Sequence, residues 1–191
     1  MSVDDVVGKV MGALERTGQI DETLAFFLSD NGFMWGEHGL VRKGTPYDQA
    51  TRVPLYVRWP RQFGAGTKDR RLVANVDIAP TVLDIAGLPT RGLDGRSLAN
   101  ERWNRRRLLL EYWCNIRGCN RWAALRTKRS QYVEYYKPSG VIRFREYYDL
   151  HKDPWQVHNL LRDRRSRNNP NVRSLHDLLS ADRRCTSRQC P

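Results

Sequence analysis

Hydrophobic positions near the start of the chain repeat with the period of an α-helix. The apolar side chains follow i, i+3, i+4 and i+7 spacing; they are Val3, Val6, Val7, Val10, Met11 and Leu14. Ser2 precedes them as a candidate N-cap with Asp5 three residues further on, and Gly18 follows as a candidate stop. The sequence therefore predicts an amphipathic helix between Ser2 and Gly18.

Two short apolar runs come after this helix. Residues 23–28, TLAFFL, form a continuous apolar run of the kind found in strands buried on both faces of a parallel sheet. Residues 53–59, VPLYVRW, predict a second strand near a sheet edge, because Pro54 has no N–H to donate. A helix followed by a buried strand is half of a βαβ unit, so we expect the chain to begin in the middle of a fold.

A second helical pattern covers residues 75–89, NVDIAPTVLDIAGLP. Pro80 suits the first turn of this helix, and Gly87 lies just past its end. The helix and the two apolar runs together favour an α/β arrangement. We therefore expect residues 1–104 to be one part of an α/β domain, with a mixed sheet and helices.

Beyond residue 104 the pattern changes to alternating strands. The predicted strands are at 107–113, 122–128, 131–136 and 143–150. KPSG at 137–140 is typical of a hairpin loop, and 171–184 predicts a closing helix. We expect residues 105–191 to form a small subdomain with an antiparallel sheet and a C-terminal helix.

Composition and charge limit the classes of function. Hydrophobic residues make up 40% of the 191 residues, which is typical of a globular protein. No apolar run is long enough to span a membrane, and no signal peptide is visible at the start. The net charge of +12 comes mainly from arginine, in clusters such as ERWNRRR and LRDRRSR. Such clusters attract acidic polymers in general, while no nucleic-acid-binding motif accompanies them.

The four cysteines form two C-x4-C pairs, Cys114 with Cys119 and Cys185 with Cys190. The spacing and the lack of a suitably placed histidine make a zinc site the weaker alternative. Two short-loop disulfides are favoured, and they indicate an oxidising compartment. This conflicts with the missing signal peptide.

The segment SDNG places Asp30 and Asn31 directly after the first predicted strand. Ligands of open α/β sheets bind at the carboxyl ends of strands, and carboxylate and amide oxygens suit Ca²⁺ or Mg²⁺. The alternative is an ordinary turn, because Asn-Gly is a strong turn signal. Lys43 could meet an anionic oxygen and His38 could contact a substrate. For both, an exposed side chain without a role is the alternative.

Five blocks of sequence, in this order, resemble the C-terminal half of the sulfatase family, which belongs to the alkaline-phosphatase-like superfamily. The blocks are LAFFLSDNG, RKGTPYDQATRVPLYVRWP, VANVDIAPTVLDIAGLP, LDGRSL and EYYDLHKDPWQVHNL. The later segments LRTKRSQYVEYY and CTSRQCP are similar to N-acetylglucosamine-6-sulfatases and their actinobacterial relatives. The resemblance implies a large mixed α/β sheet that carries the site and a smaller four-stranded antiparallel sheet with a helix.

The resemblance also implies roles for single residues. Asp30 and Asn31 match the second pair of divalent-cation ligands, and Lys43 matches the lysine that contacts the sulfate. His38 matches a position that is less uniform within the family, so the resemblance implies only a substrate contact for it. The family hydrolyses sulfate esters with a hydrated formylglycine, made from a cysteine or serine in a C/S-x-P-x-R motif.

The chain departs from the family at this nucleophile, because no C/S-x-P-x-R motif occurs in it. The family's first pair of metal ligands also has no counterpart, since Asp4 and Asp5 lie at the start of a helix. We therefore expect a C-terminal fragment with half of a metal site, inactive alone and binding Ca²⁺ or Mg²⁺ only weakly. An upstream region absent from the sequence would explain the missing signal peptide.

Partners and location follow from the same resemblance. A complete enzyme would act on a sulfated sugar or an aryl sulfate ester, and another chain could supply the N-terminal half. The alternatives are a non-catalytic arginine-rich module that binds polyanions, and a phosphate or phosphonate ester hydrolase of the same superfamily. Members of the family are secreted, whereas this chain would be cytoplasmic if Met1 is the true start.

Overall fold

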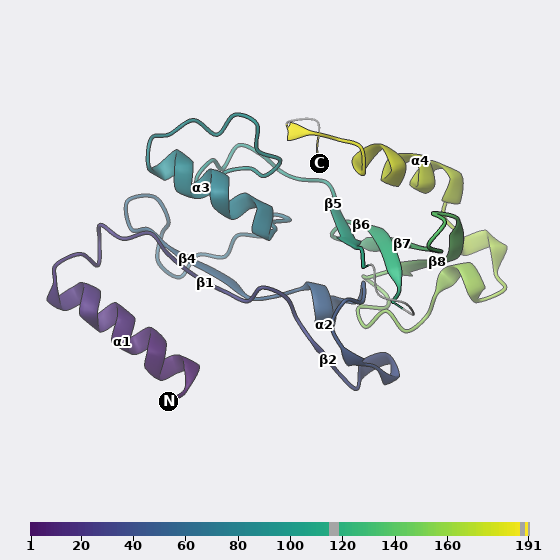
Figure 1. Ribbon diagram of the computed structural model, residues 1–191, viewed down its shortest axis with the longest axis horizontal. Coiled ribbons are helices and arrows are strands. Elements are labelled where there is room, and N and C mark those ends of the chain that lie inside the picture. Colours follow the sequence, from purple (N-terminus) through teal and green to yellow (C-terminus); the bar gives the residue numbers. More distant parts are fainter. Residues whose placement is uncertain (115–118, 188–189, 191) are drawn as a thin grey trace. The chain divides into compact units, whose positions relative to one another are not determined.

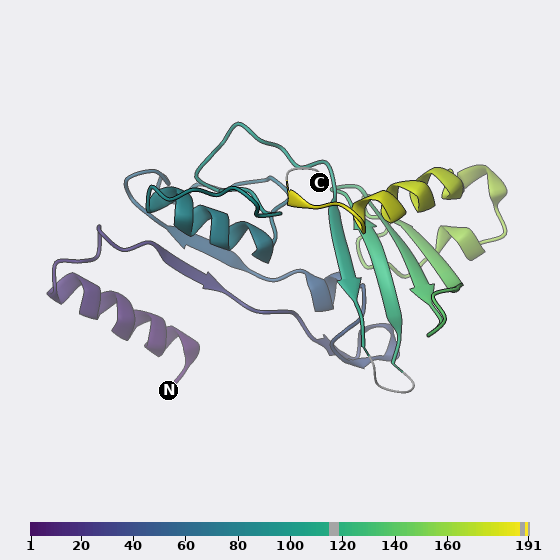
Figure 2. The ribbon, with the colours of Figure 1, turned by 45° about the horizontal axis from the view of Figure 1, so that its top comes forward.

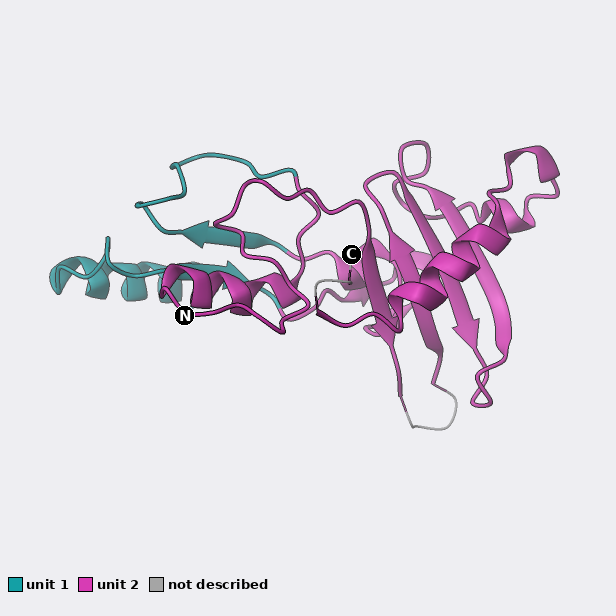
Figure 3. Cartoon of the chain, turned by 90° about the horizontal axis from the view of Figure 1, so that it is seen from above, with its two compact units in different colours: residues 1–29, 54–70 teal, residues 30–53, 71–191 magenta. Residues whose placement is uncertain are grey.

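The computed structural model describes residues 1–114, 119–187 and 190 (Figure 1). The chain divides into two compact units (Figure 3). Unit 1 combines residues 1–29 with 54–70, and unit 2 combines residues 30–53 with 71–191. The expected domain boundary between residues 104 and 105 stays a prediction.

Unit 1 begins with helix α1, Val3–Arg16. The Ser2 side chain accepts a hydrogen bond from Asp5 N at 3.2 Å, and Ser2 N donates to Asp5 Oδ2 at 2.7 Å. This reciprocal pair is a capping box, which satisfies backbone donors that the first helical turn leaves without partners. Gly18 follows the C-cap Thr17 with a φ of 68°. The predicted helix and both of its ends are confirmed.

The two strands of unit 1 pair only with each other in the described structure. Strand β1, Ala25–Leu28, runs antiparallel to β4, Leu55–Arg58, with Ala25 opposite Arg58. Phe27 is 39% exposed. Both strands are confirmed, but the expectation that β1 is buried on both faces of a parallel sheet is wrong here. A short apolar run does not specify the direction of its partner strand, and the chain between β1 and β4 reverses direction.

Unit 2 opens with short elements that carry the predicted site. Strand β2, Met34–Trp35, pairs antiparallel with β3, Val41–Arg42, and a 3₁₀ turn at Glu37–Gly39 connects them. The single-turn helix α2 covers Asp48–Thr51. The segment from 30 to 53 is therefore a compact loop region with little regular structure of its own.

Helix α3, Ile78–Ile85, follows a 3₁₀ turn at Asn75–Asp77. Pro80 lies in its first turn, and Gly87 beyond its end has a φ of 70°, as predicted. Asp77, at the N-cap of α3, is fully buried. Its carboxylate accepts two hydrogen bonds from the Arg105 guanidinium, at 2.6 and 2.7 Å. This buried ion pair joins the start of α3 to the chain that leads into the next sheet.

Unit 2 contains a four-stranded antiparallel sheet in the order β5-β6-β7-β8 (Figure 2). The strands are β5 Leu108–Tyr112, β6 Arg121–Arg126, β7 Ser130–Tyr136 and β8 Ile142–Asp149. Lys137 N donates to Val141 O in the β7–β8 hairpin, as expected for the loop at 137–140. The predicted antiparallel sheet is confirmed.

Helix α4, Val172–Asp182, covers one face of this sheet (Figure 2). Leu179 of α4 is fully buried against the sheet residues Leu125 and Tyr132. Trp122 and Val133 belong to a second buried cluster. Burying these apolar side chains is the main force that holds sheet and helix together. The predicted closing helix is confirmed.

A loop covers part of the β8 edge. The Asn159 side chain accepts a hydrogen bond from Tyr147 N at 3.1 Å and donates one to Arg145 O at 3.0 Å. Asn159 is also the N-cap of the 3₁₀ turn Leu160–Arg162, and a further 3₁₀ turn covers Ser166–Asn168. The amide of Asn159 thus takes the place of a peptide group from a neighbouring strand.

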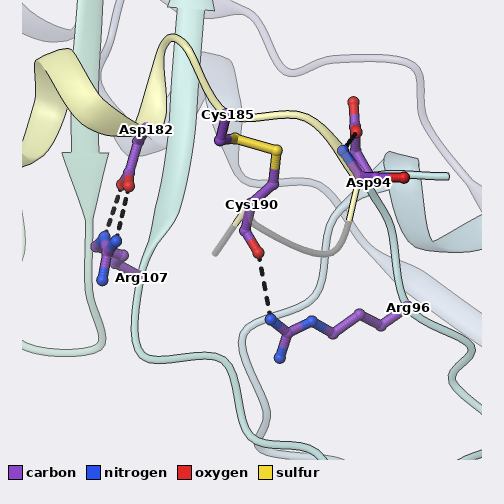
Figure 4. The surroundings of a disulfide bond; sticks show 7 residues. Asp94, Arg96, Arg107, Asp182, Cys185 and Cys190 are labelled. Atoms are coloured by element: carbon purple, nitrogen blue, oxygen red, sulfur yellow. Dashed lines mark hydrogen bonds and ion pairs between the residues drawn. A yellow bond between two sulfur atoms is a disulfide. The ribbon is translucent and has the colours of Figure 1, made fainter. Parts of the chain in front are cut away.

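Both expected disulfides, Cys114–Cys119 and Cys185–Cys190, are present. Figure 4 shows the surroundings of Cys185–Cys190. Arg96 donates to Cys190 O at 3.3 Å, and nearby Asp182 accepts two hydrogen bonds from Arg107 at 2.6 and 2.7 Å. These contacts join the C-terminal segment to the rest of unit 2. None of the described helices is long and apolar enough to cross a membrane.

Candidate functional site

Asp30 and Asn31 lie next to each other at the start of unit 2. Asp30 is exposed and Asn31 is half-buried. Both Asn31 N and Asn31 Nδ2 donate to Asp30 Oδ1, at 2.8 and 2.6 Å. These bonds fix the two side chains relative to each other, so a carboxylate and an amide oxygen are held in one small region.

Gly32 anchors this pair against the helix α2. Gly32 N donates to Ala50 O at 3.0 Å. A Cβ at position 32 would lie 2.0 Å from Gln49 O, which is a backbone atom and cannot move away independently. Only glycine allows this close approach. Residues 31–33 have no regular structure, and glycine at position 32 brings them close to α2 directly after Asp30 and Asn31.

Lys43 follows strand β3 and its side chain is exposed. The next residue, Gly44, fixes the backbone at this point. Gly44 O accepts a hydrogen bond from Trp122 Nε1 at 2.9 Å, and Gly44 has a φ of 78°. A Cβ at Gly44 would lie 2.7 Å from the Tyr112 ring. Two strands of the four-stranded sheet thus hold the segment that carries the Lys43 ammonium.

The Gly44→Ala variant is expected to lose about 1–2 kcal/mol of unfolding free energy, because alanine is strained at positive φ and Tyr112 must move. Urea unfolding followed by tryptophan fluorescence measures the difference. Gly8→Ala is the matched control; Gly8 lies in the exposed helix α1 with open space around it, so alanine should be neutral or stabilising. Equal stability of Gly44→Ala and the wild type would show that Gly44 does not anchor Lys43.

His38 is held by contacts despite its exposure. Its ring stacks on Tyr47, with centroids 3.9 Å apart and an angle of 6° between the planes. Its Nε2 lies 3.0 Å from Trp155 O. A carbonyl oxygen can only accept, so Nε2 carries the proton in this contact. These two contacts give the exposed His38 ring a defined orientation, and its role stays a prediction.

Beneath His38, Tyr47 leads to a buried carboxylate. Tyr47 OH donates to Glu146 Oε1 at 3.1 Å, and Tyr135 OH donates to Glu146 Oε2 at 3.0 Å. Burial raises the pKa of Glu146, although the tyrosine hydrogen bonds oppose this effect. Burial also raises the pKa of Tyr47, as does the nearby charge of Glu146. The ring under His38 is thus fixed by a polar network inside the sheet.

The raised pKa of Glu146 makes part of the stability depend on pH. The folded state holds this proton more tightly than the unfolded state, so the contribution is favourable at acidic pH and is lost as pH rises through the unfolded pKa of about 4.5 and then the folded pKa. We expect Glu146→Gln to remove this pH-dependent part of the free energy of unfolding. Urea unfolding at several pH values from 4 to 7 tests it, and an unchanged pH dependence in Glu146→Gln would contradict it.

The structure brings Asp30 and Asn31 into direct contact, whereas His38 contacts Tyr47 and Trp155. Sequence reasoning did not find the roles of Tyr47 and Glu146. They are 99 residues apart, and no local pattern links them. Their positions lie within the blocks TPYDQA and EYYDL, which is the signal that could have drawn attention to them.

The side chains of Asp30 and Asn31 are of the type that binds a divalent cation, but two ligands are too few to hold one. Carboxylate and amide oxygens are the hard donors that Ca²⁺ and Mg²⁺ prefer, yet Ca²⁺ takes about six to eight of them. Across residues 1–114, 119–187 and 190, no group of three or more His, Cys, Asp or Glu side chains could hold a metal ion. Any metal held by this pair needs further ligands.

Comparison with known proteins identifies the family. A family model described as "N-sulphoglucosamine sulphohydrolase, C-terminal" matches residues 36–184. The chain is 30% identical over 172 residues to an N-acetylglucosamine-6-O-sulfatase of Bacteroides thetaiotaomicron, and 40% identical over 122 residues to the N-acetylglucosamine-6-sulfatase of Homo sapiens. These alignments cover 84% and 59% of the chain.

Solved structures show the same relationship. A protein in complex with its substrate, D-glucosamine-2-N,6-O-disulfate, superimposes with a TM-score of 0.82 at 28% identity, over 93% of this chain and 37% of that one. The phosphonate monoester hydrolase of Agrobacterium radiobacter superimposes with a TM-score of 0.78 at 30% identity, over 93% of this chain and 38% of that one.

The chain spans only part of its relatives. It covers 30% of the bacterial N-acetylglucosamine-6-O-sulfatase and 22% of the human enzyme. The match from 36 to 184 includes His38 and Lys43 and the whole four-stranded sheet. The fold of helices and antiparallel strands is that of the superimposed enzymes. The chain therefore belongs to the sulfatase family of the alkaline-phosphatase-like superfamily and contains its C-terminal domain.

Proposed function

We propose that this chain is the C-terminal part of a sulfate ester hydrolase and that residues 30–53 form one wall of its active site. The observation that carries the proposal is the contact between Asp30 and Asn31, fixed by Gly32 against α2, in a chain whose relatives are sulfatases. Sulfatases generally bind a divalent cation, and these two residues would hold one, Ca²⁺ or Mg²⁺, together with ligands from elsewhere.

Each residue has a chemical task in this proposal. A sulfate ester carries a negative charge that repels an incoming nucleophile, and a bound cation would reduce this repulsion. The Lys43 ammonium would contact the sulfate oxygens and stabilise the charge that builds up on them. His38, oriented by Tyr47 and Trp155, would contact the group that carries the sulfate. The substrate class is a sulfated sugar, in line with the names of the relatives.

The nucleophile has to come from sequence outside these 191 residues, since they contain no C/S-x-P-x-R motif. It could belong to a longer chain or to a separate N-terminal half. We therefore expect the 191-residue polypeptide alone to show no sulfatase turnover. The disulfides Cys114–Cys119 and Cys185–Cys190 suit an oxidising compartment, so the assembled enzyme would act outside the cytoplasm.

A chimera tests this proposal directly. The matched segment of the B. thetaiotaomicron sulfatase is replaced by this chain, so that the relative supplies the missing sequence. The chimera should hydrolyse N-acetylglucosamine 6-sulfate, and Lys43→Ala should lower kcat/KM about 100-fold, as is typical for loss of one charge-stabilising donor. Lys128→Ala, which removes an exposed lysine from the β6–β7 turn, is the control and should be unaffected.

Two results would contradict the assignment. Equal turnover in the Lys43→Ala and Lys128→Ala chimeras would remove Lys43 from the site. A folded chimera that binds calcium but hydrolyses no sulfate ester would contradict the sulfatase function. The phosphonate monoester hydrolase superimposes as broadly as the other solved relatives, so a phosphonate monoester is the second candidate substrate and is assayed in parallel.

A further inference from the structure

A groove of about 370 Å³ lies along strand β8, away from the residues assigned above. Residues of β8, of the following 3₁₀ turn and of the start of α4 form its walls. The lining side chains that matter here are Ile142, Arg143, Phe144, Arg145, Leu161 and Arg162. The groove thus combines three guanidinium groups with an apolar wall, and it shares no residue with the pair Asp30 and Asn31.

The strand that lines the groove contains a β-bulge at Arg143. Tyr135 lies opposite Phe144 and Tyr136 opposite Ile142, so the register skips Arg143. In a regular strand, neighbouring side chains point to opposite faces. An extra residue breaks this alternation and redirects a side chain, and bulges are common next to functional sites. Ile142 lies opposite Tyr136 on the face that packs against α4, and Phe144 lies opposite Tyr135 on the other face. The groove therefore follows the edge of β8, and the extra residue Arg143 lies at this edge.

The three arginines differ in how their charge is balanced. Arg145 Nε lies 3.3 Å from the buried Glu134 carboxylate. Within the described part of the chain, no acidic side chain pairs with Arg143 or Arg162. The Arg162 guanidinium instead lies over the Phe144 ring, 5.2 Å from its centroid. Two positive charges in the groove are therefore not neutralised by the protein, and one of them is held in place by an aromatic ring.

The start of α4 adds to the positive potential. Val172, the first residue of α4, lines the groove, and the helix has 11 residues. Its first turn contains Arg173 and no acidic residue. The N-terminal end of a helix carries a partial positive charge and favours anions. The helix end and the two arginines thus both favour an anion in the groove.

We propose that this groove binds an acidic group of a sulfated sugar chain, as a subsite separate from the hydrolytic site. Arg143 and Arg162 would bind a sulfate or carboxylate, because a guanidinium forms paired hydrogen bonds with such oxygens. Ile142 and Leu161 would contact the apolar face of the sugar ring, while Phe144 orients Arg162. The choice of a sulfated sugar over other polyanions rests on the proposed function.

The groove is short, and this distinguishes the proposal from general attraction by the net charge of +12. Binding of a long nucleic acid depends on many phosphate contacts spread over a surface. Here two arginines beside an apolar wall would instead bind one or two sugar units. Removing these two charges should therefore weaken binding of a sulfated sugar far more than removing any other two exposed arginines.

The experiment measures binding of a heparin hexasaccharide to the 191-residue chain by calorimetry, in 150 mM NaCl with EDTA present. We expect Arg143→Gln/Arg162→Gln to bind at least 10-fold more weakly than the wild type. The control is Arg91→Gln/Arg106→Gln, which removes the same charge from two exposed arginines outside the groove and should lose less than 2-fold. Arg162→Lys keeps the charge but loses the planar stacking on Phe144, and it should give an intermediate loss.

Either of two outcomes would overturn the proposal. An equal loss in both double variants would show that binding depends on overall charge alone. A DNA hexamer bound as tightly as the hexasaccharide, with the same dependence on Arg143 and Arg162, would show that the groove does not prefer sugars. Because EDTA removes divalent metal and no turnover is measured, failure of the hydrolytic proposal would leave this result unaffected.

Discussion

Asp77→Ala is expected to lower the free energy of unfolding by about 3–5 kcal/mol, the usual cost of removing one partner from a buried ion pair. Asp77 and Arg105 are 0% and 3% exposed. The Asp77 carboxylate also accepts hydrogen bonds from Ala74 N at 2.9 Å and Arg96 N at 2.8 Å. The substitution would therefore leave a buried guanidinium without its carboxylate and remove the partners of two backbone donors. Urea unfolding of the purified chain measures the loss.

Two further variants separate charge from packing. Asp84 is exposed on the same helix, so Asp84→Ala should change the free energy of unfolding by less than about 0.5 kcal/mol. Asp77→Ala/Arg105→Met removes both charges, so it should be more stable than Asp77→Ala alone. If Asp77→Ala lost less than about 1 kcal/mol, or if the double variant were less stable still, the buried charge would not be the cause.

Glu134→Ala is expected to lower the free energy of unfolding by about 2–4 kcal/mol, because two buried tyrosine hydroxyls and the His176 ring lose one shared acceptor. Glu134 is fully buried in β7. Its carboxylate accepts from Tyr132 OH at 2.6 Å and Tyr136 OH at 2.7 Å, and lies 2.9 Å from His176 Nδ1. Since His176 belongs to α4, the substitution also weakens the attachment of that helix to the sheet. Thermal and urea unfolding should both report the loss.

The cost of Glu134→Ala should depend on pH. Burial alone would raise the pKa of Glu134, but hydrogen bonds from Tyr132, Tyr136 and His176 outweigh it and lower the pKa. The stabilisation is therefore present above the unfolded pKa of about 4.5 and is lost as pH falls through the folded value. Glu111→Ala, which removes an exposed ion pair with Arg183, is the control and should cost less than about 1 kcal/mol. A cost of Glu134→Ala that is equal to the control, or constant down to strongly acidic pH, would argue against this account.

Local signals in the sequence predicted most helices and strands of the fold. The capping box of Ser2 and Asp5 and the positions of Pro80 and Gly87 act within a few residues, so they can be read from sequence. The strand partners of β1 were predicted incorrectly, because four apolar residues define a strand but not its neighbour. The bulge at Arg143 was also not predicted, since it depends on the register with β7.

The candidate site shows a similar limit. The residue types of Asp30, Asn31 and Lys43 allow a cation and an anion site, but their proposed roles come from family resemblance and stay predictions. The support beneath them could not be predicted, because contacts such as Trp122 with Gly44 join residues 78 positions apart. Such long-range contacts form only when the chain folds, and no local pattern in a single sequence predicts them.

The Asn159 side chain at the β8 edge has a consequence for the behaviour of the protein in solution. An unpaired strand edge offers N–H and C=O groups to strands of other molecules and so promotes aggregation. The Asn159 side chain already forms hydrogen bonds with the N–H of Tyr147 and the C=O of Arg145. A second molecule could not add a strand along this part of β8 without displacing the amide. One side chain thus protects the small sheet against growth from this edge into intermolecular β-structure.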